Sequence, residues 1–159
     1  MKSGPLHAYL AGAGPDGRNR SIDEVLAFSD EKLERVHDYI QWLFPLPTRS
    51  SAQPSAPVLT LDEIGGIRAD EKAQANLRRA ATRMLAFYGA TQWWLASSDH
   101  NHLRITRILQ SLRLLADQEA AQEFYDVILE RHRAAGSPIS PHNLRYWAAA
   151  MNPQPPGDR

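Results

Sequence analysis

The stretch LERVHDYIQWLFPL, residues 33–46, decides how the chain is interpreted. It has aliphatic residues at helical spacing, with polar side chains placed among them before Pro45. At about 100° per residue, its aliphatic side chains share one helical face. They are Leu33, Val36, Ile40, Leu43 and Phe44. His37 lies at the edge of that face, and Trp42 lies nearly opposite. We therefore predict one helix with apolar demands on two sides, ended by the proline.

Two interpretations of the polar cluster remain open at this stage. In the structural one, Trp42 packs under the proline-rich loop that follows, and His37 is a hydrogen-bonded histidine at the edge of the core. In the functional one, His37, Asp38, Gln41 and Trp42 line a ligand pocket.

The rest of the chain alternates helical patterns with proline and glycine, without a convincing strand. Ser21 and Thr60 are each followed three residues later by glutamate, a pattern typical of capping boxes. We expect Asp30 to cap the helix that contains residues 33–44. Residues 45–59 form a proline- and serine-rich loop, and Gly65-Gly66 is expected to interrupt the helix after Thr60.

Longer helices are predicted towards the C-terminus, over residues 70–88, 100–116 and 118–135, and from Ser140-Pro141 onwards. Gly89 and Gly136 are the expected helix stops. The sequence thus predicts a single all-α domain of about six helices. It would span residues 1–151, with a disordered tail at 152–159.

The composition excludes several classes of function. The chain has 159 residues, no cysteine and a net charge of zero. Disulfides, thiolate metal sites and cysteine nucleophiles are therefore excluded, and bulk attraction to nucleic acid or anionic lipid is not expected. No apolar run resembles a signal peptide or approaches the roughly 20 residues of a transmembrane helix. We expect a cytoplasmic protein, and the excess of arginine over lysine suggests a bacterial source.

Residues 100–116 read as a central helix. One face carries Ile105, Ile108, Leu109, Leu112 and Leu115. Leu103 and Leu114 fall on the other side, so apolar contacts are expected there too. Arg104 and Arg107 would then be partly desolvated and need acidic or carbonyl partners. The candidate acids are Asp16, Glu34 and Asp38. The alternative is an anion site for a ligand carboxylate or phosphate.

Evidence for catalysis or metal binding is weak. His100 and His102 would point to different sides of a helix, so joint metal binding would need an extended start and help from His37 and Asp38. No nucleophile elbow, phosphate loop or HExxH pattern occurs, and the glycines of residues 12–17 follow no predicted strand. We predict no metal, no cofactor and no catalytic residues.

Several segments together resemble one known family. The stretch 33–46, the segments APVLT, RMLAFYGA and HLRITRILQSLRLL, and the flanking PDGRNRSIDEVL and YWAAA are similar to the conserved domain of the opioid growth factor receptor. The similarity spans residues 16–151. It implies a receptor domain inside the cell that binds an enkephalin-like peptide. It implies no catalytic residues.

We therefore predict a non-catalytic domain that binds a peptide or small anionic ligand where residues 33–46 meet residues 103–115. The predicted ligand-binding residues are His37, Asp38, Tyr39, Gln41, Trp42, Arg104 and Arg107. Asp16 and Glu34 are the structural ion-pair candidates. One alternative is a metal-assisted hydrolase that uses His37 and Asp38. Another is a protein-interaction scaffold with exposed aromatics at Trp93, Trp94 and Trp147.

Overall fold

A computed structural model describes residues 2–152, and this part of the chain contains helices and no strand. The helices are α1 (Pro5–Leu10), α2 (Ile22–Leu26), α3 (Asp30–Arg35), α4 (Ile40–Leu43), α5 (Leu61–Ala69), α6 (Glu71–Ala90), α7 (His100–Leu115), α8 (Gln118–Ala134) and α9 (Pro141–Met151). The all-α prediction is confirmed. The number exceeds the expected six because α1 to α4 are short, with six residues or fewer each.

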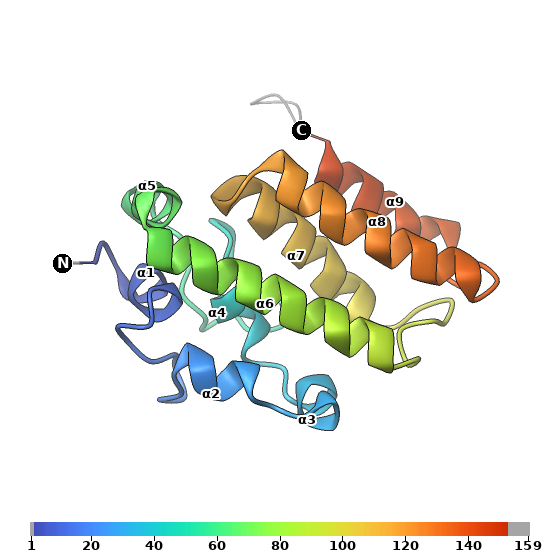
Figure 1. Cartoon of the computed structure of the whole chain (residues 1–159), viewed down its shortest axis with the longest axis horizontal. Helices are drawn as coiled ribbons and strands as arrows, with labels where there is room; N and C mark the ends of the chain where they lie inside the picture. The colour runs from blue at the N-terminus through green and yellow to red at the C-terminus, as the bar shows by residue number, and fades with distance from the viewer. Residues whose placement is uncertain (1, 153–159) are drawn as a thin grey trace.

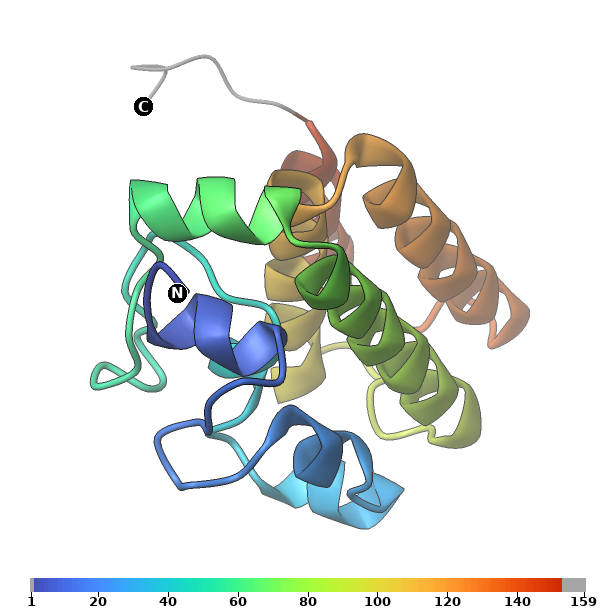
Figure 2. The same ribbon diagram turned by 60° about the vertical axis from the view of Figure 1, so that its left-hand side comes forward.

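Helix α7 occupies the centre of the fold (Figure 1). It packs against α8 and α9 on one side, and its polar side chains bind the segment 33–46 on the other. The long helix α6 crosses the molecule, and Figure 2 shows α1 below α5 and beside the start of α6. The predicted core face of α7 is confirmed, since its five aliphatic side chains are at most 1% exposed. Leu103 was wrongly expected to be buried and is 72% exposed.

The predicted single helix over residues 33–44 is wrong. Helix α3 ends at Arg35, Val36 has extended backbone, and α4 begins only at Ile40. Tyr39 Oη donates a 2.7 Å hydrogen bond to the carbonyl of Leu33, and Arg104 donates to the same carbonyl at 2.8 Å. These buried side chains replace the backbone N–H that a continuous helix would supply, so the helix can break without leaving the carbonyl unpaired.

Two of the predicted glycine interruptions are also wrong. Helix α5 continues through Gly65 and Gly66, and α6 continues past Gly89. At Gly66 a Cβ would lie 2.7 Å from His7 Nδ1, so glycine permits the close approach of α1 and α5. Gly136, in contrast, follows α8 with a φ of 88°, as expected of a helix stop.

The local cap signals were reliable. Ser21 and Thr60 form capping boxes with their glutamates, and Ser140 caps α9. Ser29, rather than Asp30, caps α3. The sequence did not predict α1, which depends on a remote partner. Glu63 of α5, only 1% exposed, accepts hydrogen bonds from the first-turn amides of Leu6 and His7.

The predicted loop at 45–59 is confirmed as non-helical, and its ends are joined by a 3.0 Å hydrogen bond from Leu59 N to Leu46 O. The predicted tail at 152–159 lies outside the described residues beyond Asn152. None of the helices described here is both long and apolar enough to cross a membrane.

Candidate ligand-binding pocket

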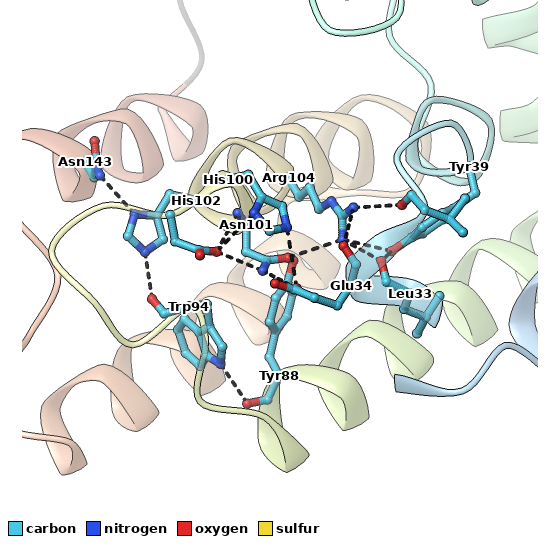
Figure 3. Close-up of polar contacts among 12 residues, drawn as sticks. Leu33, Glu34, Tyr39, Tyr88, Trp94, His100, Asn101, His102, Arg104 and Asn143 are labelled. Atoms are coloured by element: carbon cyan, nitrogen blue, oxygen red, sulfur yellow. Dashed lines mark hydrogen bonds and ion pairs between the residues drawn. The ribbon is translucent and has the colours of Figure 1, made fainter. Parts of the chain in front are cut away.

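Arg104 joins α7 to the break between α3 and α4. It is 5% exposed and donates from Nη1 to Leu33 O and Tyr39 Oη, and from Nη2 to Val36 O at 2.9 Å (Figure 3). Its partners are therefore carbonyls and a hydroxyl. Of the acids considered as partners, Glu34 contacts it only through the backbone carbonyl, at 3.5 Å. Arg104 thus stabilises the broken segment, and both of its terminal nitrogens already donate to protein acceptors.

A pocket of about 320 Å³ lies between α4, α7 and the start of the proline-rich loop. We call it the α7 pocket. It is lined by His37, Ile40, Gln41, Leu46, Thr48, Arg49, Ser50, Ser51, Ala52, His100, Leu103, Arg104, Thr106, Arg107 and Gln110. This volume is within the range of small-molecule sites in proteins. The exposed side chain of Leu103 forms part of the pocket wall.

The ionisable groups of the α7 pocket are all basic. Three arginines and two histidines line it, and none of the described lining residues is an aspartate or a glutamate. Arg107 donates from Nε to Phe44 O at 2.8 Å, and within residues 2–152 no carboxylate forms an ion pair with it. Burial lowers the pKa of Arg107 to about 10. A ligand anion would offset this desolvation of the guanidinium.

Two further side chains give the pocket its polar character. Gln41 is 4% exposed, and its Oε1 has no hydrogen-bond partner among the described residues. A buried acceptor without a donor is unfavourable. His37 is largely exposed, but partial burial of its ring, followed by the positive charges of Arg104 and His100, lowers its pKa.

Asp38 and Asp16 belong to a separate ion-pair network. Arg20 binds Asp16 Oδ2 at 2.8 Å and Asp38 Oδ1 at 2.9 Å, while Arg18 binds Asp38 Oδ2 at 2.9 Å. Burial raises the pKa of Asp38, but the hydrogen bonds and charges of these two arginines outweigh it and leave the pKa below its usual range. The expectation that Asp16 and Asp38 pair with Arg104 or Arg107 is wrong, because Arg20 and Arg18 lie closer.

The aromatic residues of the cluster lie outside the α7 pocket. Tyr39 is fully buried, with its hydroxyl bound between Leu33 and Arg104. Trp42 is 8% exposed and meets Tyr9 edge to face, with ring centroids 5.5 Å apart. Trp42 and Asp38 border a second hollow of about 210 Å³, with loop residues such as Pro57 on its other side. This is close to the structural interpretation of Trp42.

Of the seven predicted ligand-binding residues, four therefore meet in the α7 pocket: His37, Gln41, Arg104 and Arg107. Arg49 and the neighbouring hydroxyl residues were missed, because residues 45–59 read only as a linker. Their signal was an arginine and three hydroxyls, TRSS at residues 48–51, one proline after the motif.

The later histidines and tryptophans also find their places. His102 is buried, donates from Nε2 to Trp94 O at 2.8 Å and accepts at Nδ1 from Asn143, so it supports the core (Figure 3). Trp94 and Trp147 are fully buried, and only Trp93 is exposed. The exposed aromatic patch considered for an interaction scaffold is therefore not formed.

The sequence of the chain matches a known protein family. Residues 13–94 match the family model described as the opioid growth factor receptor conserved region. The chain belongs to the opioid growth factor receptor family. The matched region contains the broken helix, the loop wall of the α7 pocket and α6, while α7 follows it.

The chain is similar to several vertebrate proteins of this family. The opioid growth factor receptor of Rattus norvegicus is 39% identical over 98 residues, covering 50% of this chain and 17% of the receptor. The receptor of Homo sapiens is 39% identical over 98 residues, covering 50% and 14%. Opioid growth factor receptor-like protein 1 of Rattus norvegicus is 39% identical over 118 residues, covering 62% and 25%.

The chain thus spans a quarter or less of the length of these curated relatives. The inference of a bacterial source has no support from these matches, which come from vertebrates; arginine content reflects codon usage too indirectly to identify a source. No solved structure matches the chain.

Proposed function

We propose that the domain of residues 1–151 is a non-catalytic receptor domain that binds a peptide or small molecule through an anionic group in the α7 pocket. The observation that carries this proposal is Arg107, a half-buried guanidinium without a carboxylate partner among the described residues, in a pocket whose ionisable groups are all basic. The relatives named as receptors support the proposal.

Each wall of the pocket has a distinct part in this proposal. Arg107 holds the ligand anion through its terminal nitrogens. Gln41 borders the pocket with a side chain that is only 4% exposed. Ile40 and Leu103 supply apolar contact, instead of the Tyr39 and Trp42 expected from the sequence. Arg104 positions the segment 33–39 behind the pocket and does not itself hold the anion.

The enzyme alternative loses Asp38 as an acid or base, while its other candidate, His37, lies in the α7 pocket. Asp38 is paired with two arginines, and it borders the second hollow rather than the α7 pocket. A carboxylate held ionised by two guanidinium groups is a weak proton acceptor at neutral pH.

Calorimetry with an enkephalin-like pentapeptide that carries a free C-terminal carboxylate tests the proposal. Because hydrogen bonds to charged groups are worth about 1.5–3 kcal/mol, we expect Arg107→Gln to weaken binding by about 10- to 150-fold. Arg145→Gln is the control, since Arg145 is exposed on α9 and does not line the pocket. Binding that is absent in the native protein, or equal in native and Arg107→Gln proteins, contradicts the proposal.

A further inference from the structure

Three potential metal ligands meet where the broken helix approaches the start of α7. Glu34 comes from the last turn of α3, Asp99 is the N-cap of α7, and His100 is its first residue. One donor atom from each lies within 4.8 Å of the other two. A fourth side chain, His37, has its ring centroid 5.1 Å from that of His100.

A buried asparagine holds the two carboxylates together. Asn101 is 0% exposed, and its Nδ2 donates to Glu34 Oε1 at 2.8 Å and to Asp99 Oδ2 at 2.9 Å (Figure 3). Its own Oδ1 accepts from Tyr88 Oη at 3.3 Å, which fixes the orientation of the amide. The carboxylates are thus positioned by a hydrogen-bonded group behind them, as metal ligands commonly are.

The charges of this cluster are not balanced locally. The Glu34 and Asp99 side chains are only 20% and 17% exposed, and within residues 2–152 their sole ion-pair partner is His100. Arg104 lies on the far side of Asn101, with Nη1 3.4 Å from Oδ1, and its single charge cannot offset both acids. Two carboxylates brought together in this way favour a divalent cation.

The donor types select the class of metal. Imidazole nitrogen combined with carboxylate oxygen suits Zn²⁺ and similar transition-metal ions better than Ca²⁺ or Mg²⁺. In a tetrahedral site with bonds of about 2.0–2.1 Å, neighbouring ligand atoms lie about 3.3 Å apart. His100 Nε2 and Glu34 Oε1 are 3.5 Å apart, close to that spacing.

We propose that Glu34, Asp99 and His100 form a Zn²⁺ site at the edge of the α7 pocket. The sequence did not predict it, because the HxH spacing suggested a pair formed by His100 and His102. His102 instead points into the core, and the partners of His100 are carboxylates from α3 and from the N-cap of α7. The site does not involve Arg107, although His100 also lines the α7 pocket.

The test uses the full chain without a histidine tag, after removal of metal by a chelator. Titration calorimetry with ZnCl₂ is expected to show one ion per chain, and Co²⁺ to give the intense visible absorption of a tetrahedral site. Loss of outer hydrogen bonds to ligands already costs about 10–100-fold in affinity, so each of Glu34→Gln, Asp99→Asn and His100→Gln should cost at least about tenfold. These replacements keep the size of the side chains.

His142→Gln is the matched control, because His142 is exposed on α9, away from the cluster. It should bind Zn²⁺ like the native chain. Absence of a stoichiometric site in the native chain, weak octahedral Co²⁺ absorption, or equal losses in His142→Gln and His100→Gln would overturn the proposal. Both native-chain measurements are independent of whether any variant folds.

Discussion

Replacement of Arg104 should reveal how strongly one side chain maintains the break between α3 and α4. Arg104→Ala removes the donors to Leu33 O at 2.8 Å and Val36 O at 2.9 Å, and leaves a cavity behind Tyr39. Hydrogen bonds from a charged donor are worth about 1.5–3 kcal/mol each, so two such bonds predict a loss of about 3–6 kcal/mol in the free energy of unfolding. This would be a large share of the stability of a typical domain.

Arg104→Lys refines the same prediction. An ammonium keeps the charge but cannot span both carbonyls as the guanidinium fork does, so we expect a smaller loss of about 1–3 kcal/mol. Urea unfolding followed by far-ultraviolet circular dichroism measures both values, with Arg145→Ala as an exposed control expected within about 0.5 kcal/mol of the native protein. Losses below about 1 kcal/mol for Arg104→Ala would refute the reasoning.

Three further predictions concern packing, the pocket and acid stability. Gly66→Ala would place a Cβ 2.7 Å from a ring nitrogen of His7 in α1 and should destabilise the protein by about 1–3 kcal/mol. The Cβ of Gly65→Ala would meet nothing within 4 Å, so this variant should be neutral or more stable by up to about 1 kcal/mol. Thermal unfolding compares the two variants, and equal effects would contradict the packing argument. Gln41→Met removes an unpaired buried acceptor, so it should raise the free energy of unfolding by about 1 kcal/mol while weakening peptide binding. A lower free energy of unfolding in urea would show that the native amide oxygen has a hydrogen-bond partner. Hydrogen bonds from Lys2 and His7 hold the pKa of Asp70 well below its usual range. The contribution of Asp70 to the free energy of unfolding is therefore complete above its unfolded-state pKa of about 3.9 and is lost as the pH falls below that value. Asp70→Asn should lose stability less steeply with acid than the native protein, and identical pH profiles would exclude this contribution.

The sequence predicted what local chemistry determines. The capping boxes at Ser21 and Thr60 were correct because a cap and its glutamate are three residues apart and need no remote partner. The core face of α7 was correct because helical periodicity assigns it directly.

Errors arose where remote contacts override local preference. Leu33 is separated from Arg104 by 71 positions. No local signal indicates that the Arg104 guanidinium, rather than a helical N–H, donates to the Leu33 carbonyl. Gly66 was interpreted as a helix breaker, although its role is to let His7 approach α5. Of the candidate site, His37 and Gln41 were found because the motif is unusual, whereas Asp38 was misassigned because its arginine partners are set by the fold.

The central claim is that Arg107 holds the ligand anion, whereas Arg104 binds the carbonyls of the broken helix. A double-mutant cycle that combines Arg107→Gln with the C-terminal amide of the pentapeptide tests it most directly. Calorimetry of the four pairs is predicted to give a coupling energy of about 1.5–3 kcal/mol between the guanidinium and the carboxylate. Strictly additive losses, with a coupling energy near zero, would contradict the claim.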